Sequence, residues 1–156
     1  MNYWLIKSEP FVFSFSKLME DGFSMWDGVR NYGARNFLRA MEIDDILLFY
    51  HSNEGLEIVG IAKVLHTAYP DPTAEKGDWS AIDIVPVKRL ERAVSLKEIK
   101  QHPELQDIAL IKQSRLSVMP VTDMQFEVIM KLAETKLEQV NLFSNQQFIK
   151  HFTFVH

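Results

Sequence analysis

Five short apolar runs, each rich in β-branched and aromatic residues, constrain the fold more than any other feature of this sequence. They cover residues 3–6, 46–50, 58–65, 79–87 and 116–121. Gly, Pro, Asn or Asp stands near most of their ends, which is typical of strands bounded by turns. The runs are irregularly spaced and helical patterns interrupt them. We therefore expect five or six strands in a curved or barrel-like sheet flanked by helices, rather than a parallel βαβ series.

Three helices are predicted between and after these strands. Apolar residues at positions 34, 37, 38 and 41 form one stripe at helical spacing. Ser95 and Glu98 have the spacing of a capping box, which predicts a helix over 96–101. Thr122 and Gln125 repeat that spacing before apolar positions 126, 129, 130 and 133, and they predict the third helix.

Composition limits the class of protein. A chain of 156 residues with 47% hydrophobic composition fits one domain. The absence of cysteine excludes disulfides, thiolate zinc sites and cysteine nucleophiles, and it favours a cytoplasmic location. The first residues lack the basic leader and cleavage site of a signal peptide, and the longest apolar run, 46–50, is too short to cross a membrane. With a net charge of -4, any contact with nucleic acid should be local rather than a broad grip on phosphates.

The densest polar cluster spans residues 26–36. It combines two arginines, two asparagines, two glycines and two aromatic residues. Arginine and asparagine offer the directed hydrogen bonds that recognise a base edge, while Trp26 and Tyr32 offer faces on which a base can stack. The ordinary alternative is that Asn31 caps a helix, Arg35 is solvated and Trp26 lies in the core. From the residues alone, this alternative is the more common outcome.

Two further clusters follow predicted strands. Trp4 and the segment Lys7, Ser8, Glu9 and Pro10 form one, and Tyr50, His51 and Ser52 form the other. Both offer hydrogen-bonding groups at strand ends, although a histidine there is more often structural than catalytic. No GxSxG, GxxxxGK[ST] or GxGxxG motif is present, and the five histidines include no i, i+4 pair. We therefore expect neither a metal nor a cofactor.

Taken together, these motifs resemble the EVE domain family. The matching segments are YWLIKSEP (3–10), WDGVRNY (26–32), ARN (34–36), FYHS (49–52), VGIA (59–62), YPDPT (69–73) and RLSV (115–118). The order and spacing of these segments resemble the family from the N-terminus to about residue 132. The resemblance implies an EVE domain at 1–132 and a C-terminal extension at 133–156 packed on the same domain. It also implies an α+β, PUA-like fold: a small β-barrel of five or six strands flanked by helices, related to the YTH domain.

The function that the resemblance implies is a binding module rather than an enzyme. The partner would be modified DNA or RNA, or a nucleotide, with the base held in an aromatic and polar pocket. One alternative is a small nucleotide- or nucleoside-processing enzyme of the same fold that uses His51 or Glu9 as an acid or base. Another is a protein-interaction module that uses the apolar tail at 142–156. The base-binding residues would be Trp4, Lys7, Ser8, Glu9, Trp26, Arg30, Asn31, Tyr32, Arg35, Asn36, Tyr50, His51, Ser52, Arg115 and Ser117.

The resemblance and the charge pattern lead to expectations about the geometry of the site. The clusters around Ser8, Asn31 and Tyr50 should converge on one concave site, with Trp26 as its aromatic wall. Lys7, Arg30, Arg35 and Arg39 should form a confined positive patch. Departures from the family pattern are Gly33 in place of Gln, Asp44 in place of Gly, and a short loop at 73–79.

Overall fold

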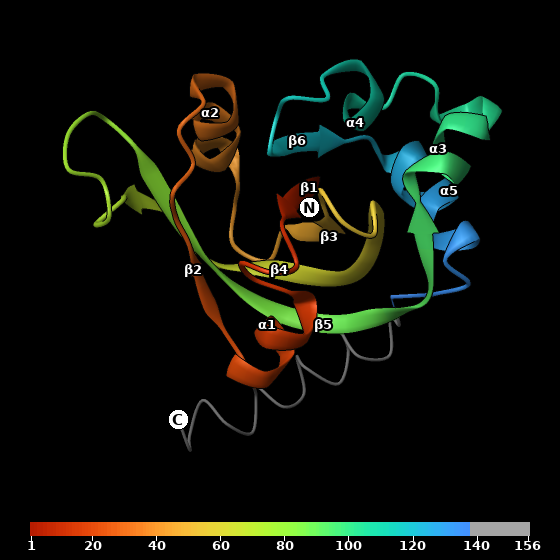
Figure 1. Ribbon diagram of the computed structural model, residues 1–156, viewed down its shortest axis with the longest axis horizontal. Helices are drawn as coiled ribbons and strands as arrows, with labels where there is room; N and C mark the ends of the chain where they lie inside the picture. The colour runs from red at the N-terminus through yellow and green to blue at the C-terminus, as the bar shows by residue number, and fades with distance from the viewer. Residues whose placement is uncertain (138–156) are drawn as a thin grey trace.

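The computed structural model describes residues 1–137 and shows an α+β fold built on one mixed sheet of six strands. Helices lie around this sheet (Figure 1). The elements in chain order are β1 (Tyr3–Ser8), α1 (Phe15–Asp21), β2 (Ser24–Trp26), α2 (Tyr32–Ala40), β3 (Ile46–His51), β4 (Glu57–Pro70), β5 (Ser80–Ser95), α3 (Leu96–Gln101), the 3₁₀ turn η1 (Pro103–Leu105), α4 (Ala109–Lys112), β6 (Val118–Val121) and α5 (Asp123–Leu132).

The strand order is β2-β5-β4-β3-β1-β6. β1 pairs in parallel with β3, and all the other pairs are antiparallel. The two longest strands, β4 and β5, contain several register shifts where they pair. Because a bulge bends a strand and increases its twist, the pair curves around β1 and β3, as Figure 1 shows. Helix α2 contacts β4, β5 and β6.

All five predicted strands and all three predicted helices are present. Both predicted capping boxes form, at Ser95 with Glu98 and at Thr122 with Gln125. The sequence patterns missed β2, a three-residue strand inside the polar cluster, and α1 with its Ser14 cap and left-handed Gly22 at the end. The patterns also underestimated the lengths of β4 and β5, which extend to residues 70 and 95. Neither addition changes the fold class.

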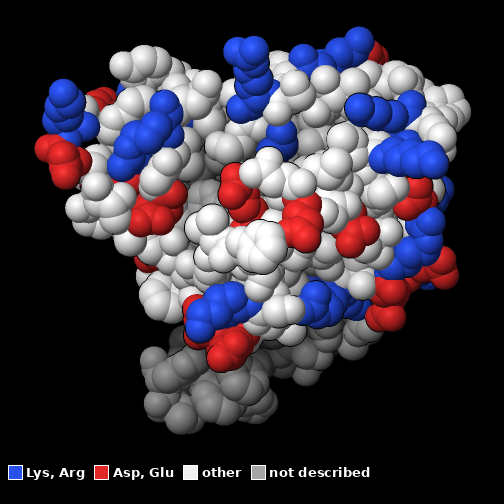
Figure 2. Space-filling view, viewed as in Figure 1, with Lys and Arg blue, Asp and Glu red and all other residues white. Residues whose placement is uncertain are grey.

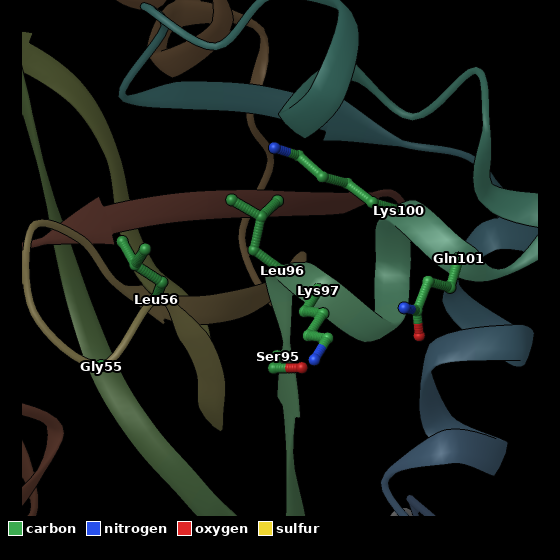
Figure 3. Close-up of a pocket in the computed structure, with 7 residues that line it drawn as sticks. All are labelled: Gly55, Leu56, Ser95, Leu96, Lys97, Lys100 and Gln101. Atoms are coloured by element: carbon green, nitrogen blue, oxygen red, sulfur yellow. The ribbon is translucent and has the colours of Figure 1, made fainter.

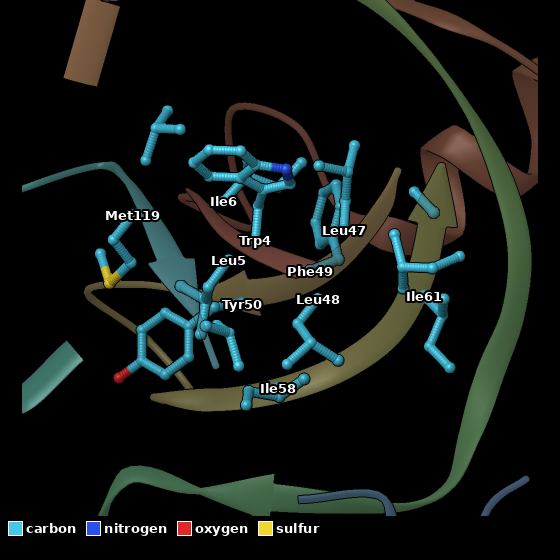
Figure 4. Packing of buried hydrophobic residues seen from close by; sticks show 14 of the residues in the cluster. Trp4, Leu5, Ile6, Leu47, Leu48, Phe49, Tyr50, Ile58, Ile61 and Met119 are labelled. Atoms are coloured by element: carbon cyan, nitrogen blue, oxygen red, sulfur yellow. The ribbon is translucent and has the colours of Figure 1, made fainter. Parts of the chain in front are cut away.

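The core occupies both sides of the central strands β1 and β3. Figure 4 shows Trp4, Leu47 and Phe49 on one side and Leu48 and Tyr50 on the other, as strand alternation requires. All five are at least 94% buried. This alternation decides which side chains can reach a site on either side of the sheet.

The turn before β3 explains one departure from the family pattern. Asp44 has a φ of 70°, in the left-handed region that glycine adopts without strain. Its neighbour Asp45 is buried, and its carboxylate accepts hydrogen bonds from the Asn2 amide, the Trp4 indole Nε1 and the Glu42 amide at 3.0, 3.0 and 2.9 Å. The turn therefore fastens the start of β1 to the start of β3.

The predicted C-terminal extension lies mostly outside the described residues. Of the range 133–156, the structure describes 133–137, where the Thr135 hydroxyl accepts a hydrogen bond from the Glu91 amide and donates one to the Ala133 carbonyl. The predicted tail at 142–156 is not described. Within residues 1–137, no helix is both long enough and apolar enough to cross a membrane.

Candidate functional site

A cavity of about 650 Å³ opens between the end of β1, the segment 24–31 and the start of β6. It brings together seven of the predicted site residues, which come from three separate parts of the chain. These residues are Lys7, Ser8, Glu9, Trp26, Arg30, Asn31 and Ser117. The remaining wall consists of Val12, Phe13, Ser24, Met25, Asp27, Gly28 and Val29.

Trp26 forms an aromatic part of this wall and is also a core residue. Only 8% of it is exposed, and its ring packs edge-on against Phe49 with centroids 5.6 Å apart. Phe13, which also lines the cavity, packs edge-on against Trp26 at 6.3 Å. Trp26 is thus a core residue, as the ordinary alternative expects, and it also borders the cavity. The ring is held rigidly by the core while it borders the cavity.

The end of β1 supplies the polar groups on one side of the cavity. Lys7 donates from Nζ to the Ser114 carbonyl at 2.7 Å, and partial burial lowers the pKa of its ammonium group. Ser8 donates from Oγ to the Phe13 carbonyl at 2.5 Å. Glu9 accepts a hydrogen bond from Asn53. These contacts fix the three side chains before any ligand arrives.

Asn31 supplies the polar group at the start of α2. Its side-chain oxygen accepts from the Ala34 amide at 3.0 Å, so it caps the helix as the ordinary interpretation expects. The amide nitrogen of the same side chain has no partner among residues 1–137. It therefore remains able to donate a hydrogen bond within the cavity.

A buried carboxylate, Asp71, holds the outer rim of the cavity. Its two oxygens accept four hydrogen bonds: from the Gly28 amide and Arg30 Nη1, both at 2.9 Å, and from the Thr73 amide and hydroxyl, both at 2.7 Å. Burial by itself would raise the pKa of Asp71, but these hydrogen bonds outweigh it and hold the pKa well below its ordinary value. Asp71 belongs to the family segment YPDPT, but no local pattern in the sequence indicates its role in the site.

Tyr32 and Arg35 lie outside the cavity, in an aromatic cluster beside it. Tyr32 is 67% exposed and stacks on Trp79, with ring centroids 5.1 Å apart and planes 18° apart. The Arg35 guanidinium lies 4.9 Å from the Tyr32 ring centre and 5.8 Å from that of Trp79. We call these three residues the aromatic platform. Asn36 accepts hydrogen bonds from Arg35 and likewise does not line the cavity.

Trp4, Tyr50, His51, Ser52 and Arg115 do not line the cavity, so their predicted convergence on it is wrong. The Trp4 indole is committed to Asp45. Tyr50 points to the opposite side of the sheet from Phe49, and burial raises the pKa of its phenol. The Ser52 amide donates a hydrogen bond to the Ser8 carbonyl, and Arg115 is exposed.

His51, at the end of β3, has a structural role. Its Nε2 accepts a hydrogen bond from the Phe15 amide at 3.1 Å, which requires a neutral ring nitrogen. Burial lowers the pKa of His51, Arg89 lowers it further and Glu57 opposes both. A histidine held as a neutral acceptor at the start of α1 does not suit the acid–base role of the enzyme hypothesis.

The predicted positive patch is divided and largely neutralised. Arg30 pairs with Asp71, Arg39 pairs with Asp78 at 2.6 Å, and Arg35 donates to the Asp78 carbonyl. Figure 2 shows acidic and basic side chains interspersed over much of the viewed face. Basic groups gather at its upper right, over α3 and α4, which carry Lys97, Lys100 and Lys112.

A second cavity, of about 560 Å³, lies between the β3–β4 turn and α3. Figure 3 shows Leu56 and Leu96 among the residues that line it, with the ammonium groups of Lys97 and Lys100 pointing apart. It has no aromatic wall, and Ser95 is already committed to the helix cap. This cavity therefore lacks the stacking face that a base needs. No cluster of His, Asp and Glu within residues 1–137 could hold a metal.

The curved mixed sheet with flanking helices places the chain in the PUA-like class of folds. A likeness at the level of the fold extends to the YTH domain of MRB1 from Zygosaccharomyces rouxii, solved with N6-methyladenosine RNA, with a TM-score of 0.56 and 19% identity over 88% of each chain. More specifically, the sequence model of the EVE domain matches residues 2–132. The chain therefore belongs to the EVE domain family.

Close relatives support this assignment. Thymocyte nuclear protein 1 of Mus musculus is 37% identical, with 86% of this chain and 75% of that protein covered. The crystal structure of Atu2648 from Agrobacterium tumefaciens has a TM-score of 0.84 and 43% identity, with 86% of this chain and 94% of that chain covered. Human THYN1, solved in complex with DNA containing 5-methylcytosine, has a TM-score of 0.80 and 32% identity, with 88% and 100% covered.

Proposed function

We propose that this protein is a binding module that holds a modified base of DNA in the cavity beside Trp26. One observation carries the proposal: the cavity joins an immobilised aromatic wall to prepositioned hydrogen-bonding groups from β1, α2 and the start of β6. A base needs a stacking face together with donors and acceptors for its edge. The relative human THYN1 was solved with DNA containing 5-methylcytosine, which favours a modified cytosine as the ligand.

The chemistry of the wall suits a base that carries a small apolar group. Trp26, Phe13 and Met25 provide contact surface for a methyl group, while Lys7 and Asn31 provide donors for ring nitrogen and carbonyl acceptors. Unstacking a base from a duplex costs a few kcal/mol, and stacking returns about 1 to 3 kcal/mol per base. The hydrogen bonds must supply the remainder. Their donors are already in place, so little ordering entropy is lost on binding.

The aromatic platform extends the site toward the DNA strand. Tyr32 and Arg35 lie just after the cavity residue Asn31, and the Arg30 guanidinium lies 5.6 Å from the Trp79 ring centre. This arrangement offers a stacking surface and a cationic group to nucleotides that flank the bound base. Since Arg30 and Arg39 are each paired with a carboxylate, few phosphates should be neutralised. The salt dependence of binding should then be shallow.

The proposal predicts that Trp26→Phe lowers affinity for a duplex with one central 5-methylcytosine about tenfold, as expected for loss of part of a stacking contact. Phenylalanine retains packing against Phe49, whereas Trp26→Ala would remove about 3 to 5 kcal/mol of stability from a buried site. Fluorescence anisotropy with labelled duplexes measures the effect, with an unmodified duplex of the same sequence alongside.

Trp4→Phe is the matched control, because it makes the same substitution at a buried tryptophan outside the cavity. It loses the hydrogen bond to Asp45 and should reduce stability without changing affinity. An unchanged affinity in folded Trp26→Phe protein, or an equal loss in both variants, would contradict the proposed function.

A further inference from the structure

Two large apolar side chains are exposed at the tip of the loop between β1 and α1. Phe11 is 89% exposed and Val12 is 77% exposed, the two highest values among the large hydrophobic residues of the described chain. Scattered exposed apolar residues are ordinary, but an adjacent pair at a loop tip offers a small contiguous apolar surface to a partner.

The loop that carries this tip is built rigidly. The amides of Val12 and Phe13 both donate to the Glu9 carbonyl at 2.9 Å, and the Ser8 hydroxyl donates to the Phe13 carbonyl. The Asn53 side chain donates to the Glu9 carboxylate and ties the loop to the β3–β4 turn. Phe13 itself turns inward onto Trp26 and Phe49. The tip is thus fixed while its two side chains face the solvent.

The loop tip lies next to the cavity, where it can contact DNA. Val12 and Phe13 line the cavity beside Trp26, and Phe11 precedes Val12 in the chain, so the tip borders the cavity. A base that enters this cavity from a duplex leaves a gap in the stack directly outside. Apolar side chains inserted between base steps are a common means of stabilising such a distortion.

We propose that Phe11 and Val12 form a wedge that enters duplex DNA at the position vacated by the base held in the cavity. This inference rests on the proposed function. The wedge replaces the stacking contacts that the extruded base has lost, and it holds open the conformation that the cavity requires. A single strand has no such gap, so the wedge contributes to the binding of duplexes alone.

The test uses the double variant Phe11→Ser/Val12→Ser with two probes: a duplex containing one 5-methylcytosine, and the modified strand alone. We expect duplex affinity to fall at least tenfold and single-strand affinity to change less than twofold. A 2-aminopurine beside the modified base reports extrusion, and its fluorescence increase should be lost in the variant. The matched control is Ile43→Ser/Met124→Ser, which removes two exposed apolar residues that do not line the cavity.

Each contrary result identifies what has failed. If Trp26→Phe weakens both probes while the wedge variant binds the duplex like the parent protein, the wedge is wrong and the base cavity stands. An equal loss on both probes also excludes the wedge. If Trp26→Phe retains affinity for both probes, the proposed function fails and the wedge fails with it. Binding of the parent protein to phosphatidylserine vesicles that the wedge variant abolishes would assign the tip to a membrane instead.

Discussion

Gly60→Ala is expected to lower the free energy of unfolding by about 2 to 3 kcal/mol, as overpacking of a closed core does. A Cβ at this position would lie 2.4 Å from Cζ of Phe15, and 2.5 and 2.6 Å from two further ring carbons. Phe15 is fully buried and packs edge-on against Phe49, so its ring has no space into which it can move. Urea denaturation followed by tryptophan fluorescence measures the loss, with an unchanged m-value expected.

A double-mutant cycle tests whether contact with the Phe15 ring causes the loss of stability in Gly60→Ala. Phe15→Leu alone should cost about 1 to 2 kcal/mol, because it shortens a buried side chain. In that background Gly60→Ala should cost about 1 kcal/mol or less, since the contact that opposed the new methyl group has gone. An equal cost of Gly60→Ala in both backgrounds would show that the close approach of the Phe15 ring is not what requires glycine.

Asp71→Asn should produce the second large effect, a loss of about 2 to 4 kcal/mol at pH 7. The substitution keeps the shape of the side chain. However, it removes the charge and presents an NH₂ group to donors that need an acceptor, among them the Gly28 amide and Arg30. Both of these residues line the cavity, so affinity for modified DNA should fall as well.

The dependence on pH separates the charge of Asp71 from its packing. The carboxyl of an unfolded chain has a pKa of about 3.9, whereas the hydrogen bonds of Asp71 hold its pKa lower in the folded protein. The stability that the carboxylate contributes is therefore complete above about pH 5 and is lost as the pH falls through 4 toward the folded pKa.

Chemical denaturation at two pH values measures this effect. The difference between the parent protein and Asp71→Asn should be about 1 kcal/mol smaller at pH 3 than at pH 7. Asp107→Asn, which changes an exposed carboxylate, is the control and should follow the parent protein at both pH values. A difference that is the same at pH 3 and pH 7 would contradict the role assigned to the ionised carboxylate.

Much of the fold could be predicted because its strongest signals are local. The apolar runs fixed five strands, and the spacing of Ser95 with Glu98 fixed the start of α3. β2 escaped prediction because three residues in a polar cluster show no periodicity, and its pairing with β5 is a long-range event. The bends in β4 and β5 likewise depend on register shifts between distant residues.

The site was predicted less completely, for reasons of geometry. The resemblance located the segments that meet at the cavity, so Ser8, Asn31 and Ser117 were correctly grouped. It could not show that Tyr50 faces the other side of the sheet, or that His51 accepts a hydrogen bond from the Phe15 amide. Phe13 and Met25 were missed because an apolar residue in a loop or short strand carries no sign of the surface it borders.

The three tryptophans make the central claim directly measurable. The three rings have different environments: Trp26 borders the cavity, Trp79 belongs to the aromatic platform, and the Trp4 indole donates a hydrogen bond to Asp45. We therefore expect their indole N–H groups to give separate NMR signals. Titration with 5-methyldeoxycytidine and then with a short DNA strand containing it tests where the base is held.

We expect the nucleoside to shift the Trp26 signal and leave the Trp4 and Trp79 signals in place, while the strand shifts both Trp26 and Trp79. Substitution of each tryptophan by phenylalanine in turn assigns the signals. A saturating titration of the DNA strand in which the Trp26 indole does not move would contradict the base cavity.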